Sequence, residues 1–174
     1  KNTAIGVDLD TGKTLWEKQA GGSSTPVASG KFLVAHAKDE KAGIVCYRWT
    51  DKGIEELWKY PKLTRRSDSS PIVEGNHVFL FGADMRLCLD LKTGKVLHKE
   101  TGKHDISSPI FADGKIFAYE IKGSFLDMVK ADPNDFTELG KTKVQALRCS
   151  SPAIVGNKLL VRMVDRIACY DLGK

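Results

Sequence analysis

Two stretches of the sequence, residues 8–16 and residues 90–98, decide the fold. They read DLDTGKTLW and DLKTGKVLH and align without a gap. Each combines a strand that ends in aspartate, a turn that contains Thr-Gly, and a second strand that carries Trp16 or His98. The column that ends this motif recurs at steps of 42, 40 and 42 residues, and its members are Trp16, Trp58, His98 and Gly140. The chain is therefore built from a repeat of about 40 residues.

A second motif marks the beginning of each repeat unit. Ser or Thr residues precede a proline, and a short apolar run, a two-residue turn with glycine and another apolar run follow. The motif occurs at residues 24–26, 69–71, 107–109 and 150–152. Its turns read Ser29-Gly30, Gly75-Asn76, Asp113-Gly114 and Gly156-Asn157, and such pairs favour the positive φ of two-residue β-hairpins. Each unit thus contains a hairpin in addition to the pair of strands around the second turn.

Four short strands and no helical pattern in each period are typical of a β-propeller blade. The sequence predicts an all-β fold of four-stranded antiparallel blades. We expect the proline strand to be innermost, because proline is tolerated at a strand start that faces a channel. One propeller portion is expected over residues 1–174, with the end of one blade at about 4–20, complete blades at 21–61, 62–101 and 102–143, and a last blade without its outer strand at 144–174.

Composition sets limits on the class of protein. The 174 residues are 41% hydrophobic and 28% charged, as in an ordinary globular protein that can bury a core without disulfides or metals. No apolar run approaches the roughly 18 residues of a membrane-spanning helix, and the first residues lack the pattern of a signal peptide. The net charge of +5 is spread along the repeats rather than gathered into a stripe, so we expect no nucleic-acid binding.

The four cysteines lie far apart and form no C-x-x-C motif, which excludes a zinc knuckle and a thioredoxin-type motif. Two disulfides in a secreted chain are one interpretation. The repeat supplies another, because Cys46, Cys88 and Cys169 occupy a slot for a small residue two positions before the end of a strand, where the first copy has Gly6. A free cysteine there acts as a small hydrophobe. The role of Cys149 is left open.

These residues resemble the pyrroloquinoline-quinone (PQQ) enzyme repeat, whose consensus is Ala-x-Asp-x-x-Thr-Gly-x-x-x-Trp. Residues 6–16 and 88–98 match it, with Gly6 and Cys88 in place of alanine and His98 in place of tryptophan. The resemblance implies a propeller similar to the quinoprotein alcohol dehydrogenases, which usually close with seven or eight blades. We therefore expect a C-terminal portion of a longer propeller, whose remainder is missing or is another protein chain. A self-contained four-bladed ring is the alternative.

The resemblance leaves two functions open, because this repeat serves quinone-dependent dehydrogenases as well as propellers without a cofactor. The latter include the lipoprotein scaffold of bacterial outer-membrane assembly. A dehydrogenase of the family needs calcium, an aspartate base and a tryptophan beneath the quinone, and none of its catalytic residues can be assigned to a position of this chain. Trp16 and Trp58 are expected to pack between blades, whereas Trp49 fits either role. The histidines occupy different places in the repeat, so we expect no metal cluster.

We therefore expect a non-catalytic platform for ligand binding or protein assembly, periplasmic or secreted as the resemblance implies, with no cofactor in this chain. The alternative is the C-terminal part of a PQQ-dependent alcohol or sugar dehydrogenase whose PQQ and calcium ligands lie in a missing segment.

A ligand is expected at one mouth of the central channel, where the loops before the first strand and between the second and third strands meet. Ten charged residues are candidates: Arg65, Arg66, Asp68, Asp84, Arg86, His104, Asp105, Arg148, Asp165 and Arg166. The same loops carry His36, Lys38, Asp39 and Lys122. Guanidinium groups suit carboxylates and phosphates, which favours an anionic small molecule or an acidic peptide. The alternative is that these are ordinary solvated loop charges that neutralise one another.

Overall fold

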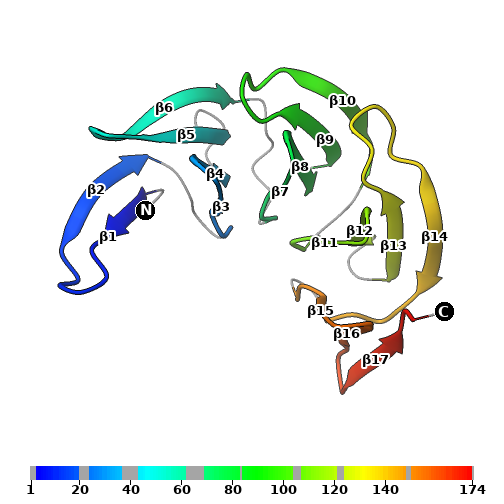
Figure 1. Cartoon of the computed structure of the whole chain (residues 1–174). Helices are drawn as coiled ribbons and strands as arrows, with labels where there is room; N and C mark the ends of the chain where they lie inside the picture. The colour runs from blue at the N-terminus through cyan, green and yellow to red at the C-terminus, as the bar shows by residue number, and fades with distance from the viewer. Residues whose placement is uncertain are drawn as a thin grey trace.

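The computed structural model describes residues 3–19, 24–36, 43–61, 69–82, 84–103, 107–120, 124–147 and 150–173. These residues form seventeen strands in five antiparallel sheets, and the sheets follow one another along an arc around a central opening (Figure 1). The described part of the chain has no helix that is long and apolar enough to span a membrane. The predicted all-β fold of four-stranded antiparallel blades is confirmed.

The chain fills the blades in sequence order. The first sheet pairs β1 (Thr3–Val7) with β2 (Thr14–Gln19). Three four-stranded blades follow: β3 (Val27–Ser29), β4 (Phe32–His36), β5 (Ile44–Thr50), β6 (Gly53–Tyr60); β7 (Ile72–Glu74), β8 (His77–Gly82), β9 (Met85–Asp90), β10 (Val96–Thr101); β11 (Ile110–Ala112), β12 (Lys115–Glu120), β13 (Phe125–Lys130), β14 (Glu138–Lys143). The last described sheet has three strands: β15 (Ala153–Val155), β16 (Lys158–Arg162) and β17 (Ile167–Asp171).

The Thr-Gly turn between the third and fourth strands is built by one aspartate. Asp8 accepts hydrogen bonds from the backbone N of Thr11 at 2.8 Å and from its Oγ1 at 2.7 Å. Asp90 accepts the same two bonds from Thr93, at 2.8 and 2.7 Å. Bonds from the threonine, first from its side chain, hold the pKa of each aspartate below its ordinary value. The turn is therefore specified locally, which explains why the sequence revealed it.

The column of Trp16, Trp58, His98 and Gly140 lies where one blade meets the next. Trp58 of β6 donates a hydrogen bond from Nε1 to the carbonyl oxygen of Leu91 in the next blade, at 2.8 Å. Its indole covers Gly94, where an added Cβ would come within 2.6 Å of Trp58 Cδ2 and where φ is +70°. Glycine is thus required in that turn for two reasons, backbone conformation and space.

The slot for a small residue lies opposite this column within each blade. Gly6 pairs with Trp16, Cys46 with Trp58, and Cys88 with His98. Cys46 and Cys88 are buried free thiols, as expected for small hydrophobes, whereas Cys169 is also free but exposed. Cys169 differs because its sheet, as described, has no fourth strand to cover it. Cys149 lies outside the described residues.

The hydrophobic core is divided into layers between neighbouring blades. One cluster joins Val34 and Ile44 to Val78 and Leu80, and so connects β3–β6 with β7–β10. Similar clusters connect β7–β10 with β11–β14 and β11–β14 with β15–β17, and a fourth contains Ala4 of β1. Because each blade buries its faces against its neighbours, blade contacts determine the stability of the whole arc.

Candidate functional site

Four of the ten predicted channel-mouth residues can be placed. Arg65, Arg66, Asp68, His104, Asp105 and Arg148 lie outside the described residues, as do Lys38, Asp39 and Lys122. The anion site as a whole therefore stays a prediction.

Arg86 has a different environment from the one expected. It is the second residue of β9, not a loop residue, and its side chain is only 1% exposed. Its Nη2 donates a hydrogen bond to Oδ2 of Asp127 at 2.7 Å, and its guanidinium lies 4.9 Å from the centroid of the Phe81 ring. The expectation of an exposed arginine at the mouth is corrected, because β9 begins before Arg86 and directs it into the next blade.

The other three placed residues do lie in or beside turns. Asp84 is exposed in the turn before β9, with φ of 61°. Asp165 and Arg166 are exposed in the turn before β17, where Arg166 Nη1 donates to both oxygens of Asp165 at 3.1 Å. This ion pair matches the alternative in which loop charges neutralise one another.

The interior charges form one cluster between the blades β7–β10 and β11–β14. Asp127 occupies the slot that holds Cys46 and Cys88 in other blades, and it is fully buried. Besides Arg86, it lies near Lys141, whose Nζ is 3.3 Å from Asp127 Oδ1 and which also donates a hydrogen bond to Glu120. The bond to Glu120 is the main cause that raises the pKa of Lys141. Two cations and two anions thus balance one another.

This arrangement suits structural locking better than chemistry. Each charge in the cluster has an opposite charge in contact, as in a structural ion-pair network. Nearby, burial raises the pKa of Tyr119 to about 12, which keeps its hydroxyl neutral. We interpret the cluster as a contact that fixes two blades relative to each other.

The Ser-Ser-Pro motifs form a belt of hydrogen bonds at the inner ends of the blades, which sequence reasoning missed. The backbone N of Thr25 donates to Ser70 Oγ at 2.8 Å, and the backbone N of Ser70 donates to Ser108 Oγ at 2.9 Å. His36, another residue of the expected loop class, is buried with Nδ1 2.7 Å from the carbonyl oxygen of Ser69. The recurrence of serine before each proline was the available signal.

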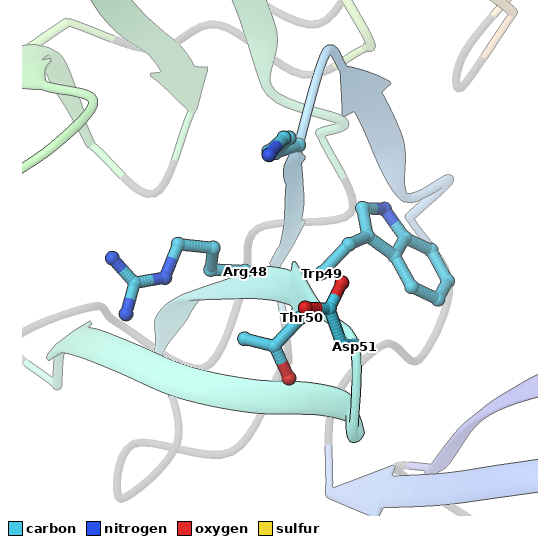
Figure 2. Close-up of a pocket in the computed structure, with 5 residues that line it drawn as sticks. Arg48, Trp49, Thr50 and Asp51 are labelled. Atoms are coloured by element: carbon cyan, nitrogen blue, oxygen red, sulfur yellow. The ribbon is translucent and has the colours of Figure 1, made fainter.

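The pocket shown in Figure 2 lies at the outer turn of β5 and β6. Its volume is about 460 Å³, and it is lined by Lys31, Arg48, Trp49, Thr50 and Asp51. Arg48 and Trp49 point to opposite sides of β5. Arg48 donates from Nε to Glu55 at 3.1 Å, and the Trp49 ring lies 5.5 Å from that of Trp16 in an edge-to-face arrangement. Both side chains are therefore engaged in structural contacts, which favours the packing role for Trp49.

Two clefts separate the last described sheet from β11–β14. Their volumes are about 310 and 590 Å³, and both are bordered by Phe117, Met128, Asp171 and Leu172. The smaller cleft also borders Gly140, the glycine member of the column that holds Trp58 elsewhere. Gly140 has no side chain to fill this space, whereas the indole of Trp58 covers Gly94 at the corresponding contact.

One group of potential metal ligands is found among the described residues. His98, Glu100 and Asp135 each place a ligand atom within 4.8 Å of the others. They lie at the same blade contact as the charge cluster, since Glu100 is paired with Arg86 in the strand register.

A family model described as outer membrane protein assembly factor BamB matches residues 1–146. The chain belongs to this family. The expected relation to the PQQ-like β-propellers is confirmed, and the BamB match covers the first sheet and all three complete blades. No curated protein sequence matches the chain significantly.

Solved structures share the architecture at low sequence identity. BamB from Moraxella catarrhalis is 12% identical, with a TM-score of 0.77, over 97% of this chain and 51% of that chain. A europium-containing methanol dehydrogenase is 16% identical, with a TM-score of 0.55, over 70% of this chain and 24% of that chain. A chain of the mitotic checkpoint complex is 13% identical, with a TM-score of 0.76, over 99% of this chain and 59% of that chain. These likenesses show the fold, and the chain spans about half the length of the BamB structure.

Proposed function

We propose that this chain is a non-catalytic propeller portion that acts as a protein-binding platform in the assembly of outer membrane proteins, in the periplasm. The observation that carries the proposal is the BamB family match over residues 1–146. The buried ion pair of Arg86 and Asp127 also supports a rigid platform, because it joins two neighbouring blades. A scaffold of this kind needs rigid blades more than it needs a reactive group.

The last described sheet offers a place for a protein partner. In each of the three complete blades the third strand pairs with a fourth, whereas β17 pairs only with β16 in the described part of the chain. An edge of this kind presents backbone groups to which another strand can add. Ile167, 67% exposed, and the exposed residues Tyr170 and Leu172 supply apolar side chains along it.

We infer that an extended segment takes the fourth-strand position beside β17. The three complete blades support this, because the same edge is covered there by β6, β10 and β14 in antiparallel register. The segment comes from the remainder of the propeller or from another protein chain. Apolar side chains of this segment would pack on the last sheet and extend toward the cleft of about 590 Å³.

The dehydrogenase alternative requires PQQ and calcium. Calcium takes oxygen ligands, whereas the potential metal ligands gathered in the described residues include the imidazole of His98. This group does not fit the calcium site of such an enzyme, whose ligands the alternative places in a missing segment, so we derive no catalytic step for this chain. Adding PQQ with calcium and measuring dye reduction with alcohols or sugars tests the alternative, and any turnover would overturn the platform proposal.

Site-specific photo-crosslinking tests the platform itself. A benzoylphenylalanine replaces Tyr170 in the chain, which is directed to the periplasm of a Gram-negative bacterium that lacks its own family member. We expect a discrete crosslink to a protein of the outer membrane assembly machinery, identified by mass spectrometry. Lys52, an exposed turn residue in another blade, is the matched control position. No product from Tyr170, or equal labelling from both positions, would contradict the proposal.

The channel mouth remains a separate proposal for an anionic small molecule or an acidic peptide. Replacing Arg66 and Arg148 with alanine should weaken the binding of such a ligand, measured by calorimetry with an acidic peptide. Unchanged binding would remove these residues from the site.

A further inference from the structure

Three potential metal ligands from two blades converge beside the column residue His98. His98 and Glu100 are two positions apart on β10, so their side chains share one face of the strand. Asp135 belongs to the connection between β13 and β14 of the next blade, which lies against β10 in Figure 1. One ligand atom from each residue lies within 4.8 Å of the others, and Nε2 of His98 is 3.6 Å from Oε1 of Glu100.

Buried neighbours hold this group in place. The ring of Phe136, next to Asp135 in the sequence, lies 4.8 Å from the His98 ring in an edge-to-face arrangement. Phe136 is itself buried, and its ring lies 5.1 Å from that of Phe81. The hydroxyl of Thr137 donates a hydrogen bond to the Asp135 carboxylate. Packing thus positions His98, and a hydrogen bond orients Asp135, before any ion arrives, which reduces the cost of binding.

The nitrogen that faces the carboxylates has no hydrogen-bond partner. Nε2 of His98 is buried, and it neither accepts nor donates a hydrogen bond. An unsatisfied buried polar atom is costly, and a metal ion bound there would satisfy it. On the other side of Glu100, Lys103 Nζ lies 3.9 Å from Oε2, so Oε1 is the oxygen left toward His98.

We propose that His98, Glu100 and Asp135 bind one zinc ion, which links the blade β7–β10 to the blade β11–β14. One imidazole and two carboxylates are ligands that zinc accepts at a tetrahedral site, with water as the fourth ligand. Calcium and magnesium prefer oxygen alone, so the imidazole selects against them. This site departs from the expectation of no metal cluster. That expectation considered only the histidines, whereas two of the three ligands here are carboxylates, one on the same strand as His98 and one in the following blade.

Titration calorimetry with zinc chloride tests the site on the chain without an affinity tag, in a Cys169→Ser background that removes the exposed thiol. We expect one zinc ion per chain. Each of His98→Gln, Glu100→Gln and Asp135→Asn should weaken binding at least tenfold, because each removes one of three protein ligands. His77→Gln and Asp113→Asn, a half-buried histidine and an exposed aspartate elsewhere, are the matched controls and should bind zinc as the parent does.

One of these variants and one further measurement separate loss of a ligand from loss of the fold. Asp135 is exposed, so Asp135→Asn keeps the blades folded even if a His98 variant does not. Zinc should also raise the midpoint of thermal unfolding of the parent chain and leave that of Asp135→Asn unchanged. Absence of saturable zinc binding by the parent, or binding that Asp135→Asn leaves unchanged, would overturn the proposal.

Discussion

Replacing Arg86 with methionine tests whether the charge cluster locks the blades. Arg86 and Asp127 are each 1% exposed and 2.7 Å apart, so the substitution leaves a buried carboxylate without its main partner. Removing one member of a buried ion pair typically costs about 3–5 kcal/mol of the free energy of unfolding. Lys141 Nζ remains 3.3 Å from the other oxygen of Asp127, so we expect a loss near the lower end, about 3 kcal/mol.

The double variant Arg86→Met with Asp127→Cys provides the comparison that isolates the pair. The repeat has cysteine at this position in three other blades, and apolar replacement of a whole buried pair is often neutral or stabilising. We therefore expect the double variant to lose at least about 2 kcal/mol less than the sum of the two single losses. Urea unfolding followed by fluorescence measures all four proteins, compared at equal m values. Additive effects, or a loss below about 1 kcal/mol for Arg86→Met, would refute the locking role.

Four other predictions follow from the blade contacts. Trp58→Phe removes the 2.8 Å hydrogen bond to the next blade and should lower the free energy of unfolding by about 1–2 kcal/mol in urea titration. Gly140→Trp places an aromatic side chain beside the cleft of about 310 Å³, and a Cβ at Gly140 meets only Met128, at 3.6 Å. Calorimetry should therefore show a free energy of unfolding that is higher by about 0.5–2 kcal/mol. Burial raises the pKa of Cys46 and of Cys88 from an ordinary 9.0 to about 12. Iodoacetamide at pH 8 should therefore modify the exposed Cys169 and leave the two buried thiols unmodified until the chain unfolds, which peptide mass spectrometry measures. The contribution of these two neutral thiols to stability is fully present below about pH 9 and is lost as the pH rises toward 12. Over that pH range, a Cys46→Ala, Cys88→Ala variant should lose less free energy of unfolding than the parent chain does.

The parts of the fold that local chemistry specifies were predictable from the sequence. The turn at Asp8 needs only the side chain of Thr11 three residues away, and the repeat shows the same pair at Asp90. Glycine in the hairpin turns and the alternation of apolar residues likewise act within a few residues. The blade count and the strand order follow from these local units in sequence order.

Contacts between blades were not predictable to the same degree. Arg86 looked like a loop residue because the end of a strand cannot be placed to one residue from the sequence, and its partner Asp127 lies 41 positions away. The serine belt joins residues 45 and 38 positions apart. One signal was present, however: a carboxylate in a slot that otherwise holds glycine or cysteine implies a buried cation from a neighbouring element.

The column of Trp58, His98 and Gly140 places a smaller side chain at each successive blade contact. The indole of Trp58 fills its contact and donates a hydrogen bond across it, whereas His98 fills less space and leaves a buried nitrogen unsatisfied. Gly140 fills nothing, and a cleft of about 310 Å³ remains beside it. This contact borders the three-stranded sheet whose β17 edge we propose as the docking strand. Buried apolar residues, among them Phe117, Leu159 and Val161, pack this contact beside the cleft, so an added strand would extend an existing core.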